Sequence, residues 1–229
     1  MQHDLISIIL PVYKQADHIE IVVREYIDAL SKLQNPHELI LVVNGCSKAE
    51  FGAYAGLDVT YKTVKLMHLK VGGWGRAVRA GLEAAGGSML CYTNSARTSP
   101  QDLVMMLIYA LTQPDVIVKA NRKIRESLVR RIGSLLYNLE CRTLFDLVYW
   151  DVNGTPKVFP RKFDDLLRME RDDDLIDLEF NVICRRNEYP VIEVPLFSTK
   201  RHGGSSTTSA RSALRMYLRA IGMWRAMKR

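Results

Sequence analysis

The stretch Leu5-Ile-Ser-Ile-Ile-Leu10, which continues into Pro11-Val12-Tyr13, decides the fold of this chain. It is a short apolar run of the kind that forms a buried strand. A second such run, Glu38-Leu-Ile-Leu-Val-Val43, ends on Asn44-Gly45-Cys46-Ser47, and an amphipathic stretch of helical length lies between the two. This order predicts a β-α-β unit. Its two strands end at one edge of a parallel sheet, where open α/β folds bind their ligands.

The rest of the chain continues the alternation of strands and helices. Strands are predicted at 5–11, 38–44, 64–69, 89–92, 115–119, 156–160 and 191–197. Helices are predicted at 17–33, 48–56, 75–85, 100–111, 125–145, 175–186 and 210–229. Such alternation is typical of a mixed, mostly parallel sheet flanked by helices. We therefore expect one α/β domain over residues 1–209, followed by a basic amphipathic helix at 210–229.

The composition narrows the class of protein. Of the 229 residues 48% are hydrophobic, which is enough to bury one substantial core. No apolar run approaches the roughly 20 residues of a membrane span, and the early Asp4 and the short run after it do not resemble a signal peptide. The four cysteines are widely spaced and form no Cys-x-x-Cys pair, which favours reduced, mostly buried thiols in a cytosolic protein over a zinc site.

The net charge of +7 is concentrated near the C-terminus. Residues 197–229 hold eight Lys or Arg and no Asp or Glu, whereas the other 196 residues hold 24 basic and 25 acidic side chains. A nucleic-acid-binding protein with a uniformly basic surface would not have this distribution, so no nucleic-acid partner is expected. A local basic terminus suits a phosphate-bearing ligand, an anionic membrane surface or a solvated helix face.

Three motifs of the second half have a recognisable order. They are Asp151-Val-Asn-Gly-Thr-Pro-Lys157-Val-Phe-Pro-Arg161, Asp177-Leu-Glu179 and Arg201-His202-Gly203-Gly204-Ser-Ser206. Together with the strand ends of the first half, they resemble family 2 glycosyltransferases of the GT-A fold, and among these the polyprenyl-phosphate sugar transferases. The resemblance extends from about residue 5 to 206. It implies a single Rossmann-like GT-A domain and a nucleotide diphosphate sugar, of the UDP or GDP type, as the donor.

The resemblance also implies a donor site. Pro11 and Tyr13 would open the donor pocket, and Asn44 stands where the family has an Asp that holds the nucleoside. The turn Gly72-Gly73-Trp74-Gly75-Arg76 resembles the family's Gly-Lys-Gly-x-Ala segment, which makes Gly73 and Arg76 candidate donor-binding residues. Glycines at a helix N-terminus allow backbone N–H groups to approach an anion. On its own, however, such a turn is most often an ordinary strand-to-helix connection.

Thr93-Asn94-Ser95 occupies the place of the family's Asp-x-Asp, the carboxylates that hold Mg²⁺ or Mn²⁺ between the donor's two phosphates. Hydroxyl and amide oxygens are weak substitutes for carboxylates as ligands of hard divalent cations. A metal cofactor is therefore disfavoured, and these three residues are expected to contact the donor directly. Either the pocket has lost its chemistry, or cations such as Arg97, Arg122 or Arg201 neutralise the pyrophosphate in the metal's place.

Asp177 and Glu179 are the candidate catalytic residues. An inverting transfer uses a carboxylate that takes the acceptor's proton, and the resemblance makes Asp177 the first choice and Glu179 the second. Two positions apart on a helix they diverge by about 200°, so at most one faces the pocket. A lipid phosphate acceptor, already anionic, would make a strong base dispensable. Arg201, His202 and Gly203 belong either to an ordinary loop or to a lid that closes on the pyrophosphate.

The C-terminal stretch 210–229 has an apolar face, which includes Leu218, Ile221 and Trp224, and a separate row of arginines. The apolar face has three alternative partners: the domain itself, a second subunit in a homodimer, or the anionic inner face of a membrane.

These features predict a cytoplasmic, membrane-peripheral hexosyltransferase of polysaccharide biosynthesis. It would transfer a sugar to a lipid-linked or glycan acceptor with inversion and without a metal. The alternative is a catalytically inactive nucleotide- or sugar-binding relative that serves as a partner subunit. A nucleotidyltransferase is a weaker alternative, because the Gly-rich Lys/Arg signature of that class is absent near the first strand.

Overall fold

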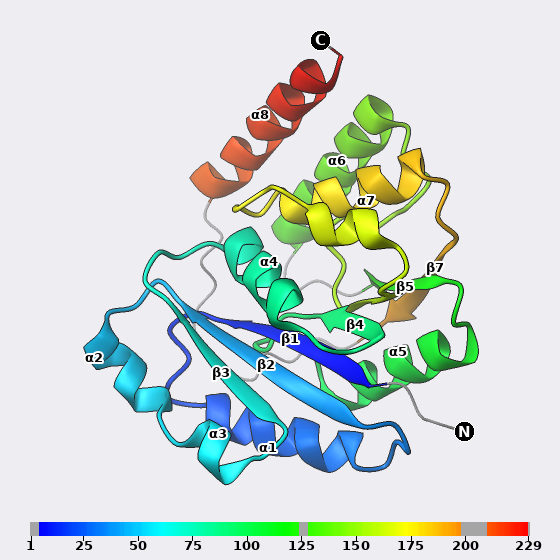
Figure 1. Cartoon of the computed structure of the whole chain (residues 1–229). Coiled ribbons are helices and arrows are strands. Elements are labelled where there is room, and N and C mark those ends of the chain that lie inside the picture. Colours follow the sequence, from blue (N-terminus) through cyan, green and yellow to red (C-terminus); the bar gives the residue numbers. More distant parts are fainter. Residues whose placement is uncertain (1–4, 124–127, 198–209, 229) are drawn as a thin grey trace.

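The computed structural model of the chain describes residues 5–123, 128–197 and 210–228. Its centre is a seven-stranded sheet in the order β3-β2-β1-β4-β6-β5-β7 (Figure 1). The strands are β1 Ile6–Val12, β2 His37–Asn44, β3 Val64–Leu69, β4 Met89–Tyr92, β5 Ile117–Arg122, β6 Lys157–Pro160 and β7 Val191–Leu196. Only β6 among them runs antiparallel to its neighbours, so the predicted mixed, mostly parallel sheet is confirmed.

Helices cover both faces of this sheet, which explains why β1 and β2 are apolar along nearly their whole length. One face carries α1 Ile19–Leu30 and α5 Pro100–Thr112, with the short helices α2 Lys48–Phe51 and α3 Leu57–Thr60 beside them. The other face carries α4 Trp74–Ala84, α6 Leu128–Phe145, α7 Ile176–Arg186 and α8 Ala210–Met227. Two 3₁₀ turns, η1 Gly52–Tyr54 and η2 Asp164–Arg168, complete the described elements.

Two predicted elements need correction. The helix predicted at 48–56 is wrong beyond Phe51, because η1 follows and Gly56 then takes a left-handed conformation (φ +91°) that separates α2 from α3. The strand predicted at 115–119 begins later and extends further, because the Val116 N–H closes a turn on the Gln113 carbonyl. β5 then pairs with β7 from Ile117 to Arg122.

The C-terminal helix α8 packs on the domain. Ala220 and Met223 are buried, and the Tyr217 ring meets the Tyr137 ring of α6 at 5.5 Å between centroids. The domain thus contacts one side of this helix, whereas Leu218 of the predicted apolar face is 61% exposed, so contact with a second subunit or a membrane stays a prediction. In the part of the chain that the structure describes, no helix has the length and apolar character required to cross a membrane.

Candidate functional site

The carboxyl ends of β1, β2 and β4 meet at one edge of the sheet. The antiparallel strand β6 adds its first residue to the same edge, because Lys157 pairs with Tyr92, the last residue of β4. The Lys157 side chain is fully buried. This edge therefore combines the predicted donor-binding residues of the first half with charged residues of the second half.

The loops after β1, β2 and β3 converge here. Gly45 has a φ of +68°, and a Cβ at this position would lie 2.9 Å from the Tyr13 ring and 3.1 Å from the Cα of Gly72. Any other residue at position 45 would be strained and would push the three loops apart. Tyr13 is 41% exposed above this contact, whereas Pro11 is buried within β1. Tyr13 is thus the accessible aromatic surface at this edge.

Asn44 joins two of these loops through its side-chain amide. Its Nδ2 donates to the Val12 carbonyl at 2.9 Å, and its Oδ1 accepts the Gly73 N–H at 3.2 Å. An ionised Asp has no hydrogen to donate and would face the Val12 carbonyl with a like partial charge. The amide therefore suits this position in a way that a carboxylate does not.

The Gly-rich turn packs tightly against the loop 170–173. A Cβ on Gly73 would lie 2.6 Å from the Asp172 carbonyl oxygen, and one on Gly75 would lie 2.2 Å from that of Arg171. The Arg76 N–H donates to the Asp172 carbonyl at 3.0 Å, and its guanidinium pairs with the Asp172 carboxylate at 2.7 Å, which lowers the pKa of that carboxyl group. The glycines thus permit close packing between two loops of the same chain. A role for Gly73 and Arg76 in binding the donor stays a prediction.

The polar side chains of the turn after β4 form hydrogen bonds with other groups of the protein. The Thr93 and Thr98 hydroxyls are 2.6 Å apart, and the Ser95 hydroxyl donates to the Gln15 side chain at 2.9 Å. The Asn94 side-chain oxygen accepts the Ala96 N–H at 3.0 Å. These neutral and already bonded oxygens do not fit a hard divalent cation, which prefers carboxylates. In the described ranges, no group of three or more His, Cys, Asp or Glu side chains is placed to hold a metal ion.

Asp177 lies in the first turn of α7, is 5% exposed and accepts three hydrogen bonds. The Trp74 indole N–H donates to Oδ2 at 3.0 Å, the Tyr92 hydroxyl donates to Oδ1 at 3.0 Å, and the Lys157 ammonium donates to Oδ1 as well. Burial lowers the pKa of Lys157 to about 8, although Asp177 opposes this change. The carboxylate is thus fixed by partners from α4, β4 and β6.

Glu179, the second catalytic candidate, serves a different contact. Its two carboxylate oxygens accept the backbone N–H groups of Glu170 and Arg171, each at 2.9 Å. These bonds hold the loop that packs against the Gly-rich turn. Asp177 and Glu179 therefore face different surroundings, as their spacing on a helix requires.

Two further ion pairs, each with one partly exposed partner, lie near the Lys157–Asp177 pair. Arg122 donates from Nε and Nη2 to the two carboxylate oxygens of Asp151 at 2.9 and 3.0 Å. Lys119 donates to Glu193 at 2.8 Å and to the Asp151 carbonyl at 2.7 Å. Arg122, one of the cations predicted to replace the metal, is thus already paired with a carboxylate.

Sequence reasoning placed Asn44, Asp177 and the 93–95 turn at this edge, and it named Lys157 only as part of a motif. It did not identify Trp74 and Tyr92 as partners of Asp177. Trp74 directly precedes the predicted helix 75–85 and Tyr92 ends the predicted strand 89–92, but nothing in the sequence pairs them with a residue of α7. The candidates Arg201, His202 and Gly203 lie outside the described residues. The four cysteines are free and three of them are buried, as predicted.

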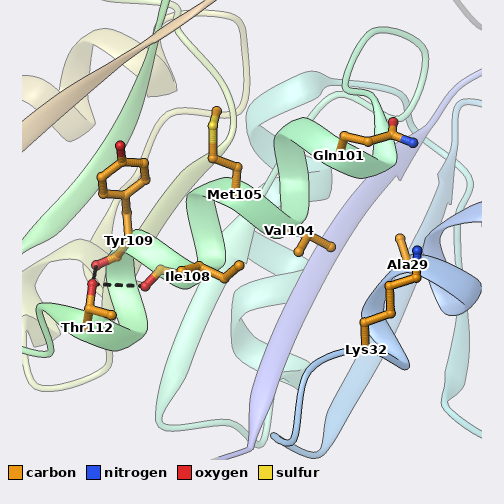
Figure 2. Close-up of a pocket in the computed structure, with 8 residues that line it drawn as sticks. All are labelled: Ala29, Lys32, Gln101, Val104, Met105, Ile108, Tyr109 and Thr112. Carbon is orange, nitrogen blue, oxygen red and sulfur yellow. Dashed lines mark hydrogen bonds between the residues drawn. The ribbon is translucent and has the colours of Figure 1, made fainter.

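A separate hollow of about 510 Å³ lies between α1 and α5, on the opposite face of the sheet. Figure 2 shows its lining, in which Lys32 is the one charged side chain and Val104, Met105 and Ile108 supply apolar surface. It does not adjoin the edge described above, and its lining does not suit a nucleotide diphosphate.

Comparisons with known proteins agree with this geometry. The model of the family described as glycosyl transferase family 2 matches residues 7–165. The undecaprenyl-phosphate 4-deoxy-4-formamido-L-arabinose transferase of Pectobacterium atrosepticum is 24% identical over 210 residues, which cover 89% of this chain and 62% of the relative. The transferase of the same name from Salmonella choleraesuis is 21% identical over 208 residues. The chain thus spans less than two thirds of these relatives.

Solved structures share the fold. Glucosyl-3-phosphoglycerate synthase of Mycobacterium tuberculosis, in complex with Mn²⁺, UDP and glucosyl-3-phosphoglycerate, superposes with a TM-score of 0.68 at 16% identity. The alignment covers 95% of this chain and 77% of that one. The same enzyme with Mg²⁺ and UDP gives a TM-score of 0.67 at 18% identity, over 96% of this chain and 80% of that one. These likenesses establish the GT-A fold of the domain.

Proposed function

Because this chain belongs to glycosyl transferase family 2, we propose that it transfers a sugar from a nucleotide diphosphate sugar to a lipid-linked acceptor of the polyprenyl phosphate class. The observation that carries the proposal is the site at the carboxyl edge, where Asp177 is fixed beside the ends of β1, β2 and β4. The names of the curated relatives support the acceptor class, and the UDP in the structural neighbours supports the type of donor.

The surroundings of Asp177 favour a phosphate acceptor over a glycan hydroxyl. Two lone pairs on each oxygen allow four hydrogen bonds, and three are already made, so only one acceptor position on Oδ2 remains. Such a carboxylate is poorly placed to remove a proton from an attacking hydroxyl. A lipid phosphate needs no proton removed before it attacks the anomeric carbon, and attack from the face opposite the nucleotide would invert that carbon.

The donor would lie against Tyr13 and Asn44, with its diphosphate near the 93–95 turn and the Gly-rich turn. We propose that this binding does not require a divalent cation, because the oxygens of Thr93, Asn94 and Ser95 are neutral and already bonded. Calorimetric titration of UDP and GDP in EDTA and in Mn²⁺ measures this directly. A gain in affinity of about tenfold or more with Mn²⁺, roughly 1.4 kcal/mol, would contradict it.

Arg201, outside the described residues, is the proposed cation for the diphosphate. Arg201→Ala is expected to weaken UDP or GDP binding by about 1.5–3 kcal/mol, the size of a charge-assisted hydrogen bond. Arg215→Ala is the matched control, because Arg215 is an exposed arginine of α8 and its loss removes the same charge. Equal affinities for the two variants would exclude a direct role for Arg201.

Transfer itself is tested with labelled UDP and GDP sugars and polyprenyl phosphate in detergent, with label in the organic phase as the readout. Asp177→Asn is expected to reduce transfer strongly, because it removes the charge that pairs with the buried Lys157 in this site. Glu179→Gln should retain most of the transfer, because Glu179 contacts backbone N–H groups away from Asp177 and the amide oxygen can still accept one of the two hydrogen bonds. Binding of nucleotide without transfer to any acceptor would instead favour a non-catalytic partner subunit. The absence of carboxylates from the 93–95 turn is the observation that supports this second candidate.

A lipid-linked acceptor also implies that the protein works at the cytoplasmic surface of a membrane. The basic segment 210–229 would contribute positive charge there, and it carries no acidic residue.

A further inference from the structure

Helix α6 presents an apolar stripe to solvent. Ile132, Leu135, Leu136 and Leu139 are 49%, 56%, 52% and 59% exposed, and their spacing places them on one side of the helix. The opposite side of α6 is buried through Tyr137 and Cys141. Large aliphatic side chains gathered on one exposed helical face indicate a surface that another structure covers.

The surface continues beyond the helix. The Arg142 guanidinium, one turn after Leu139, lies over the ring of Trp150 at 3.9 Å from its centroid. Trp150 is 55% exposed and the nearby Val148 is 60% exposed. We call Ile132, Leu135, Leu136, Leu139 and Trp150 the α6 stripe. A tryptophan and an arginine at the end of an aliphatic stripe suit the boundary between acyl chains and headgroups.

Helix α6 and the neighbouring helix α8 are rich in arginine. Helices α6 and α8 together contain seven arginines and one glutamate, a net charge of +6 out of +7 for the whole chain. The two helices lie together, because Tyr217 of α8 contacts the Tyr137 ring and donates to the Gly133 carbonyl. Figure 1 shows both helices on the same side of the sheet, away from α1 and α5.

Helix α8 contributes little of the apolar part of this surface. Its Ala220 and Met223 are buried against the domain, and Leu218, at 61% exposed, is its one exposed large hydrophobic side chain among the described residues. Arg215 and Arg219 are exposed, and Arg219 pairs with Asp173 at 2.9 Å. The helix therefore contributes mainly positive charge beside the stripe, and α6 contributes most of the exposed aliphatic side chains.

We propose that the α6 stripe docks on an anionic phospholipid bilayer, with its aliphatic side chains among the acyl chains and the arginines of α6 and α8 among the headgroups. A second copy of the chain fits less well, because two such faces would bring arginines of like charge together, among them the exposed Arg215. The inference deepens the proposed function by naming the surface that would bring the protein to a lipid-linked acceptor. In that respect the inference rests on the proposed function.

The test is co-sedimentation of the full chain with vesicles of phosphatidylcholine that contain phosphatidylglycerol, in the absence of donor and acceptor. Wild-type protein should bind these vesicles, bind phosphatidylcholine alone much less, and lose binding as salt rises. The double variant Leu135→Gln/Leu139→Gln, which leaves the charge unchanged, should bind about tenfold more weakly or worse. Its matched control is Val59→Gln/Ile108→Gln, which removes similarly exposed residues from the opposite face and should bind as wild type.

A second measurement does not depend on the stripe variant. The chain has three tryptophans, so Trp74→Phe/Trp224→Phe leaves Trp150 as the only one. Lipids brominated in the acyl chain should quench its fluorescence. Unchanged vesicle binding by the stripe variant, equal loss in the control, or an unquenched Trp150 would overturn the inference. The inference would also be overturned if light scattering gave the molar mass of a dimer for wild type and of a monomer for the stripe variant. These experiments contain no sugar donor, so their outcomes do not depend on whether the protein transfers a sugar.

Discussion

The turn after β4 and the charged cluster around α7 lie at the same edge of the sheet and satisfy their polar groups in opposite ways. In the turn, the Thr93 and Ser95 side chains are neutral and bond to Thr98 and Gln15. Around α7, full charges are buried together, with Lys157 against Asp177 as the deepest pair. The Thr93, Asn94 and Ser95 side chains carry no formal charge, whereas the charges around α7 are balanced within the protein.

This difference shows which charged side chains are available to bind a ligand. Asp151, Asp177 and Glu193 each have an arginine or lysine partner of their own, so none of these three carboxylates is free for a cation. With Arg122 paired to Asp151, the other predicted cations for a donor diphosphate are Arg97, at the end of the turn, and Arg201, which the proposal names. Buried ion pairs are weak evidence for stability, since their desolvation cost offsets their attraction. We therefore interpret the α7 cluster as fixing the position of Asp177.

The largest effect should come from breaking the central pair. Lys157→Met removes the ammonium and leaves the Asp177 carboxylate buried with only the Trp74 and Tyr92 hydrogen bonds. Loss of one partner of a buried pair costs about 3–5 kcal/mol. Urea unfolding at neutral pH measures the free energy of unfolding.

The control is Lys157→Met/Asp177→Asn, which removes both charges and leaves an amide whose oxygen can accept from Trp74 and whose NH2 group can donate to the Tyr92 hydroxyl oxygen. Most of the lost stability should return. If the single variant is as stable as wild type, the pair does not hold a charged carboxylate and the contrast between the two regions fails.

A smaller effect is expected when a negative charge is placed among the uncharged residues 93–95. The Ser95 hydroxyl is fully buried and donates to Gln15, with the Pro11 carbonyl oxygen 3.3 Å away. A carboxylate from Ser95→Asp would face two acceptors, so it should cost about 2–3 kcal/mol. Ser95→Asn, similar in size but uncharged, is the control for steric effects. A large rise in thermal stability of Ser95→Asp in Mn²⁺ would mean that the turn can form a metal site.

Much of this architecture follows from local sequence, and the missing parts depend on long-range contacts. The strand ends at Asn44 and Tyr92 were predictable because short apolar runs end there on polar or glycine residues. The Gly-rich turn was recognised, but its close contact with the loop 170–173 was not, since no local pattern reports it. Trp74 and Tyr92 bond to Asp177 across 103 and 85 residues of chain. Such pairs arise when α4, β4 and α7 pack, and neither propensity nor periodicity encodes them.

The finest test of the comparison is the pH dependence of stability, because only the charged region contains a lysine whose pKa is strongly displaced. Burial lowers the pKa of Lys157 to about 8 from an ordinary value of 10.5. Between these values the unfolded chain binds more protons than the folded one, so stability rises with pH. From pH 8 to about 9.5 the gain should be about 1.5 kcal/mol, at roughly 1.36 kcal/mol per unit of pKa difference. Above pH 10 the ionisation of tyrosines, whose pKa burial raises, would oppose this trend.

Urea unfolding of wild type and of Lys157→Met/Asp177→Asn across pH 7–9.5 isolates the effect of Lys157. The double variant lacks this lysine, so its free energy of unfolding should rise less with pH than that of wild type. A wild-type curve parallel to that of the variant would mean that Lys157 titrates normally, and the two regions would then differ in geometry but not in electrostatics.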